Sequence, residues 1–94
     1  MRVEWQDRAQ QDTFEIVAYI DIHNPFAALA IVGEIRRQVA TLAEHPHLGR
    51  PGRRRGTREL VVNGTPYIVA YRIDGNVVRV IHVRHGARRW PRRL

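Results

Sequence analysis

Residues 59–83, with the sequence ELVVNGTPYIVAYRIDGNVVRVIHV, decide the fold of this chain. Two turn-forming segments, Asn63-Gly64-Thr65-Pro66 and Asp74-Gly75-Asn76, divide this stretch into three apolar runs. Short apolar runs bounded by such residues are typical of β-strands joined by hairpins. The middle run is almost wholly apolar, as expected of a central strand covered on both faces. We therefore predict a three-stranded meander with strands at residues 59–62, 67–73 and 77–83.

Two helices are predicted upstream of this meander. Apolar residues recur every three or four positions over residues 9–20 and again over residues 28–42, which places them on one face of each helix. Asn24-Pro25 separates the two segments, because Asn is a favourable N-cap and Pro is tolerated at the first helical position. The second helix is expected to end near His45, since a residue that precedes a proline is pushed out of the helical region.

The complete order of elements predicts the fold class. Residues 2–5 alternate with period two and predict a short first strand. The order β-α-α-β-β-β then indicates an α+β protein in which an N-terminal helical hairpin packs on an antiparallel sheet. Residues 45–56 are rich in Pro, Gly and Arg and predict the longest exposed loop. Because 94 residues suffice for one core and show no linker or repeat, we expect one domain over residues 1–94.

The composition excludes several classes of protein. The chain has no Cys, so it forms no disulfide and no thiolate metal site. It starts without a signal-peptide pattern, and no apolar run approaches the roughly 18 residues of a membrane helix. His82 and His85 lie three residues apart on a strand and start on opposite faces, so they are poorly placed to share a metal. We expect a cytoplasmic protein without a metal, a cofactor or a membrane anchor.

Charge is divided unevenly between the two halves of the chain. Residues 1–49 hold four Arg against seven Asp and Glu, whereas residues 50–94 hold twelve Arg against two, for net charges of −3 and +10. All positive side chains are Arg, whose forked guanidinium groups suit phosphates and carboxylates. We predict that this half contacts an acidic partner or nucleic acid through two clusters. Their residues are Arg50, Arg53, Arg54, Arg55 and Arg58 in the first, and Arg88, Arg89 and Trp90 in the second.

Two features of these clusters stay open at this point. The Arg-rich loop could simply be a solvated loop, and Trp90 could cover the edge of the sheet rather than stack on a base. A ribonuclease would also need a proton carrier, because Arg stays protonated and only stabilises charge. His85 is the best such group, and Arg58 and Arg88 would be its cationic neighbours.

The combined motifs resemble the RelE/ParE superfamily of bacterial toxin–antitoxin modules. The resemblance spans almost the whole chain and rests on Trp5, Asn24-Pro25 with Ala27-Ala28, Pro46 with Gly49-Arg50-Pro51-Gly52, residues 56–62, residues 66–72 and His85 to Trp90. It implies the β-α-α-β-β-β fold and a cognate antitoxin that forms a hetero-oligomer with this chain. RelE-like members cut messenger RNA on the ribosome, and ParE-like members poison DNA gyrase.

Two positions favour the ParE-like branch within this resemblance. RelE-like nucleases tend to carry an Arg directly after the Tyr of the middle strand and often a Tyr near the C-terminus. This chain has Ile68 and Trp90 at about these positions. The resemblance therefore implies a gyrase inhibitor without catalytic residues. The alternatives are a ribosome-dependent ribonuclease that uses His85, Arg58 and Arg88, and a stand-alone nucleic-acid-binding module.

Overall fold

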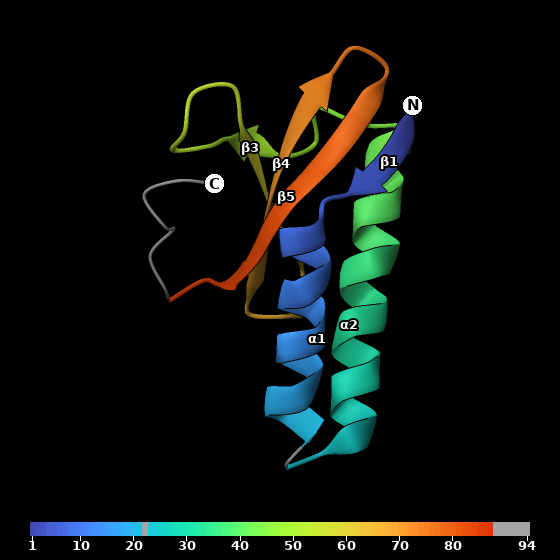
Figure 1. Ribbon diagram of the computed structural model, residues 1–94, viewed down its shortest axis with the longest axis vertical. Coiled ribbons are helices and arrows are strands. Elements are labelled where there is room, and N and C mark those ends of the chain that lie inside the picture. The colour runs from blue at the N-terminus through green and yellow to red at the C-terminus, as the bar shows by residue number, and fades with distance from the viewer. Residues whose placement is uncertain (22, 88–94) are drawn as a thin grey trace.

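Two α-helices and five strands make up most of the part of the protein that the structure describes. The computed structural model describes residues 1–21 and 23–87. In chain order the elements are β1 (Arg2–Trp5), α1 (Asp7–Asp21), α2 (Pro25–Ala40), a 3-10 turn (Thr41–Ala43), β2 (Arg50–Pro51), β3 (Arg58–Val61), β4 (Tyr67–Asp74) and β5 (Val77–His85). The strands form one sheet in the order β1-β5-β4-β3-β2, and the two helices lie side by side as an antiparallel hairpin (Figure 1). The predicted α+β fold and its order of elements are confirmed.

One edge of the sheet differs from the antiparallel expectation. β1 runs parallel to β5, from Arg2 opposite Val77 to Trp5 opposite Val80, so the sheet is mixed. A parallel pairing needs a long crossover, and here both helices and three strands lie between the partners. The other edge is β2, two residues long, which pairs with β3 inside the segment predicted as a loop. A strand of two residues is too short to leave a period-two pattern in the sequence.

The helical hairpin starts and turns where its sequence predicts. The side chain of Asn24 accepts a hydrogen bond from the Ala27 N–H at 3.1 Å, and Pro25 occupies the first helical turn. α2 ends at Ala40, several residues earlier than predicted, because the chain tightens into the 3-10 turn before it reaches Pro46. None of the described helices is long and apolar enough to cross a membrane.

The core lies between the helices and one face of the sheet. Its fully buried members come from α2, the 3-10 turn and the central strands, and they include Ile35, Val39, Leu42, Val69, Tyr71, Val78 and Val80. Burial of each aliphatic side chain of this kind contributes about 1.5–3 kcal/mol. The meander turns with a two-residue loop between β4 and β5, in which Gly75 has a φ of +56°, a conformation that favours glycine.

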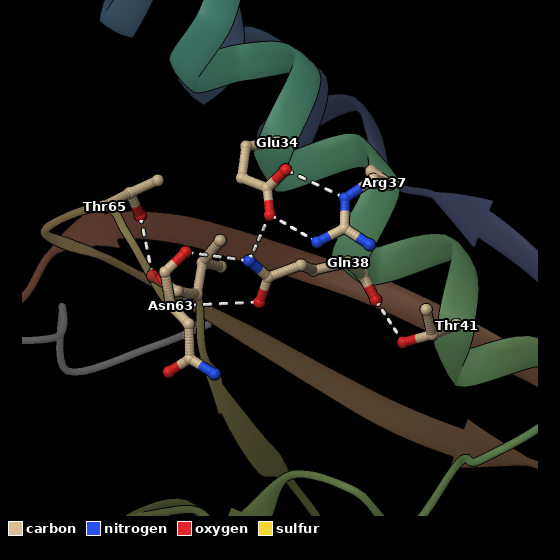
Figure 2. Close-up of polar contacts among 7 residues, drawn as sticks. Glu34, Arg37, Gln38, Thr41, Asn63 and Thr65 are labelled. Carbon is tan, nitrogen blue, oxygen red and sulfur yellow. Dashed lines mark hydrogen bonds and ion pairs between the residues drawn. The ribbon is translucent and has the colours of Figure 1, made fainter.

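A side-chain amide ties α2 to the turn between β3 and β4 (Figure 2). Gln38 donates to the Asn63 C=O at 2.8 Å and accepts from the Asn63 N–H at 3.1 Å, as a peptide group would. Gln38 also donates to Glu34 at 2.6 Å, and Glu34 in turn accepts from Arg37 at 2.8 Å. The amide thus satisfies both backbone groups of an exposed turn residue and fixes the distance between helix and sheet.

Candidate functional site

The arginine cluster of the sequence lies on an ordered hairpin between β2 and β3. The Gly52 N–H donates to the Thr57 C=O at 2.8 Å, and the Thr57 hydroxyl donates to the Arg54 C=O at 2.6 Å. Gly56 closes the turn with a φ of +78°. A Cβ at Gly52 would meet the Thr57 hydroxyl at 2.4 Å, so this position excludes any larger residue. The tip therefore presents Arg53, Arg54 and Arg55 from a fixed backbone, and all three are exposed.

Two of the predicted cluster residues have structural partners. Arg50 forms an ion pair with Glu59, with 3.0 Å between guanidinium nitrogen and carboxylate oxygen, and Glu59 is buried. Arg58 donates to the Gly49 C=O at 2.7 Å. The side chains of Arg53 and Arg55 make no hydrogen bond or ion pair with the described part of the chain. These two are the cationic groups of the hairpin that remain available to a partner.

Arg84, which no pattern in the sequence singles out, belongs to the same surface. It stands on β5 opposite Ile68, is only 7% exposed and donates to the C=O groups of His85 and Gly86 at 3.2 and 3.1 Å. Burial lowers the pKa of Arg84, the Glu59 carboxylate opposes this shift, and the charges of Arg53 and Arg50 add to it. Arg84 thus interacts electrostatically with Arg50, Arg53 and Glu59 of the hairpin. This proximity becomes visible only once the strands are paired.

A groove of about 720 Å³ separates α1 from the end of β5. Its apolar walls include Ile16, Tyr19 and Tyr67, and its charged rim includes Arg8, Glu15, Arg84 and His85. This groove exists because β1 pairs with β5 only as far as Val80. Beyond that point, α1 lies beside the open edge of the strand.

Asp12 on α1 occupies this open edge and is buried at the base of the groove. Its carboxylate accepts the Val83 N–H at 2.8 Å, contacts the His82 ring nitrogen Nδ1 and lies 3.4 Å from Arg8. A buried strand N–H without an acceptor would cost free energy, so the carboxylate replaces the missing strand neighbour. The sequence pattern predicts His82 on a strand but contains no signal for its partner 70 residues away.

Two of the residues proposed for ribonuclease chemistry, His85 and Arg58, are not brought together. His85 lies opposite Tyr67 and Arg58 lies opposite Tyr71. Four residues of strand separate them by about 13 Å, at roughly 3.3 Å per residue. The Nδ1 atom of His85 accepts from the Ala87 N–H at 3.1 Å, and its ring meets the Tyr67 ring edge-on at 5.7 Å. Arg88, Arg89 and Trp90 lie outside the described residues, and so does the predicted capping role of Trp90.

Tyr71 has a structural role. Its hydroxyl donates to the Pro46 C=O at 2.7 Å and accepts from the Gly49 N–H at 2.8 Å. Burial raises the pKa of Tyr71, so the phenol stays protonated at neutral pH. A Cβ at Gly49 would lie 2.6 Å from this ring. Tyr71 therefore anchors the segment that leads into β2. Among residues 1–21 and 23–87, no group of three His, Asp or Glu side chains is placed to hold a metal ion.

Known proteins with similar sequences are bacterial toxins. Residues 3–90 match the family described as "ParE toxin of type II toxin-antitoxin system, parDE". The chain is 44% identical over 93 residues to the candidate toxin Y4kP of Sinorhizobium fredii, which covers 99% of this chain and 96% of that protein. It is 34% identical over 87 residues to Toxin RelE2 of Caulobacter vibrioides, which covers 93% of this chain and 97% of that protein.

Solved structures of toxin–antitoxin systems share the architecture. The chromosomal ParDE system from P. aeruginosa matches with a TM-score of 0.81 and 26% identity, over 90% of this chain and 95% of that one. The intact E. coli RelBE complex matches with a TM-score of 0.68 over 93% of this chain and 98% of that one, and at 13% identity it supports the fold alone. Fold and sequence together define a RelE/ParE superfamily toxin. Within that class, the chain belongs to the ParE toxin family of type II toxin–antitoxin systems.

Proposed function

We propose that this toxin inhibits DNA gyrase in the cytoplasm and is neutralised by a cognate antitoxin. The observation that carries the choice of gyrase is the residue after Tyr67. RelE-like nucleases place an Arg there, whereas Ile68 in this chain is buried against Ala70. An apolar side chain at this point supplies no charge to a scissile phosphate. The match to the ParE family and the higher TM-score to ParDE point in the same direction.

The separation of His85 from Arg58 also supports a toxin without nuclease chemistry. Cleavage of RNA needs a base, an acid and a cation around one phosphate, all within hydrogen-bonding reach. The strand register holds these two residues about 13 Å apart along β4. We therefore expect the protein to act by binding rather than by bond cleavage.

A gyrase assay tests this proposal. The purified toxin is mixed with gyrase, ATP and supercoiled plasmid, and the accumulation of cleaved plasmid is measured after protein digestion. We expect wild type and His85→Ala to trap cleaved DNA equally well, because His85 has no catalytic role. A toxin that arrests growth but leaves gyrase unaffected at saturating concentration would contradict the proposal.

The RelE-like alternative has one observation in its favour, the 34% identity to Toxin RelE2. Its test is cleavage of messenger RNA on programmed ribosomes, followed by primer extension. If His85→Ala abolished such cleavage while the variant stayed folded, the ribonuclease function would replace the gyrase function. A stand-alone nucleic-acid-binding module is the third possibility, and unaffected growth on expression without an antitoxin would favour it.

The antitoxin part of the proposal rests on charge and on relatives. The structures of ParDE and RelBE are toxin–antitoxin systems or complexes. A net charge of +10 over residues 50–94 would attract an acidic, flexible segment. Co-purification with the product of the neighbouring open reading frame tests this point. Affinity should fall as salt rises, since exposed ion pairs are screened.

A further inference from the structure

The outward face of α2 exposes large apolar side chains far from the arginine hairpin. Phe26 is 84% exposed and Leu29 is 70% exposed, while Ala30 and Gly33 lie open to solvent on the same face. These positions follow the spacing i, i+3, i+4, i+7, so they form one continuous stripe on a helix. Residues 25–33 contain no charged side chain. Contiguous apolar surface of this kind marks an interaction site on a small protein.

The sizes of the side chains along this stripe are self-complementary: the order read in reverse places a small residue opposite each bulky one. Two bulky residues, Phe26 and Leu29, come first, and two small ones, Ala30 and Gly33, follow at matching distances. A Cβ at Gly33 would have no atom within 4 Å, so the surface above this glycine is open. A two-fold axis between residues 29 and 30 would place Phe26 of one copy against Gly33 of the other, and Leu29 against Ala30. In a two-fold contact, if residue i touches residue j, then j touches i.

We infer that this face of α2 docks on the same face of a second copy of the chain. The size pattern carries the choice of occupant, because each bulky side chain finds a small one only when the partner has the same order read in reverse. A helix of another protein would not require the bulky half and the small half of the stripe to complement each other. An acidic partner, in turn, would be drawn to the arginine hairpin rather than to an uncharged surface.

The distribution of charge allows two cationic chains to meet at this surface. Each copy carries a net charge of +7, which opposes association. The beginning of α2 and the loop between β2 and β3 lie at opposite ends of the long axis (Figure 1), so the arginine hairpins of two docked copies would lie apart. Two arginines follow Gly33 along the stripe. Arg37 is paired with Glu34 at 2.8 Å (Figure 2), so its charge is neutralised within its own chain, and Arg36 lies over the Trp5 ring at 5.2 Å.

The interface is small, and the expected association is correspondingly weak. Four side chains per copy bury less than the roughly 800 Å² per partner of a standard interface, so we expect a dissociation constant of about 10 µM or weaker. This self-association does not depend on the toxin's target, and its measurement does not involve gyrase or ribosomes. Failure of the proposed function would leave it untouched.

Sedimentation velocity of the purified full-length chain over a range of concentrations tests the inference. Phe26→Ala should weaken the dimer about tenfold or more, since the largest apolar side chain of the interface is lost from both copies. Gly33→Phe should weaken it to a similar extent, because two bulky residues would then oppose each other. The double variant Phe26→Ala with Gly33→Phe restores one bulky and one small residue per pair, and should return to within about threefold of wild type.

Controls separate this contact from other effects. Leu48→Ala removes another exposed apolar side chain, which lies outside the α2 stripe, and should leave the dimer unchanged; Leu48 is 60% exposed. Raising salt from about 50 to about 500 mM should strengthen the dimer, because repulsion between the cationic copies is screened. A chain that stays monomeric at concentrations well above about 10 µM, the expected dissociation constant, would overturn the inference. A double variant weaker than both single variants would do the same, and so would a cross-link from residue 33 to the antitoxin in place of a second copy.

Discussion

The first turns of α2 and the arginine hairpin are both exposed, yet they use opposite chemistry. Residues 25–33 present apolar side chains without charge, whereas residues 50–58 present five arginines around one buried carboxylate. Contacts of the first kind strengthen or persist as salt rises, and contacts of the second kind weaken. One small domain can therefore hold a second copy and an acidic partner at separate places without competition between the two.

The largest expected effect comes from breaking the contact between the helical hairpin, which carries the first region, and the sheet, which carries the second. Asp12→Ala removes the carboxylate that joins α1 to β5 and leaves the Val83 N–H and the His82 ring without it. We expect a loss of about 3 kcal/mol in the free energy of unfolding, measured by urea denaturation. Asp7→Ala, in the exposed first turn of the same helix, serves as the control. A loss as small as that of the control would show that the carboxylate is dispensable.

A second variant tests the anchor beneath the arginine hairpin. Tyr71→Phe keeps the ring but removes the acceptor of the Gly49 N–H and the donor to the Pro46 C=O. We expect a loss of about 2 kcal/mol in unfolding free energy, because a buried N–H is left without a partner. Tyr19→Phe is the matched control, since Tyr19 is 68% exposed. Equal stability of the two variants would contradict the anchoring role.

Within the arginine hairpin, structural and binding roles should separate. Arg50→Ala removes the Arg50 ion pair from buried Glu59 and should cost about 1 kcal/mol of stability, a modest value because Arg50 itself is largely exposed. Arg53→Ala and Arg55→Ala should leave the melting temperature unchanged. They should instead weaken antitoxin binding by about 0.5 kcal/mol each and reduce its salt dependence, as measured by calorimetry at two salt concentrations. Equal effects of all three variants on stability would contradict the assignment of a structural role to Arg50 and binding roles to Arg53 and Arg55.

The smallest effect concerns pH and the charge next to the α2 face. The Arg37 guanidinium, helped by Gln38, lowers the pKa of the Glu34 carboxyl from 4.5 to about 2. Because the folded pKa lies below the unfolded one, ionised Glu34 stabilises the fold above pH 4.5, and this contribution is lost as the pH falls toward 2. Thermal unfolding of Glu34→Gln should show a slightly shallower loss of stability over this range than wild type. Identical pH profiles would mean that the exposed pair is fully screened.

The sequence predicted most of the fold because its signals are local. The turns at residues 63–66 and 74–76, the Asn24 cap and the two helical stripes each depend on neighbouring residues, and the structure has each of them. The partner of β1 could not be predicted, because strand pairing over 70 residues leaves no local pattern. β2 could not be predicted because two residues are too few to show a period-two pattern. For the same reason, the roles of Asp12 and Gln38 emerge only once helix and sheet are assembled.

The candidate site was predicted by composition but not by geometry. The arginine-rich loop was found from charge alone, yet charge does not distinguish Arg50, which holds Glu59, from Arg55, which faces solvent. Arg84 was missed because an arginine in a mostly apolar strand gives no sign of its cross-strand neighbours. Pairwise contacts between distant segments decide these roles, and a linear pattern carries little information about them.

The parallel pairing of β1 with β5 also bears on how the chain reaches its fold. The first strand to leave the ribosome pairs only with residues 77–80, so it waits unpaired while almost the whole domain is synthesised. Long-range pairing of this kind slows folding, since the entropy of closing a large loop is lost before the contact forms. The central hairpin of β4 and β5 has far closer partners and should form first. Active toxin would then appear only after synthesis of this domain is nearly complete.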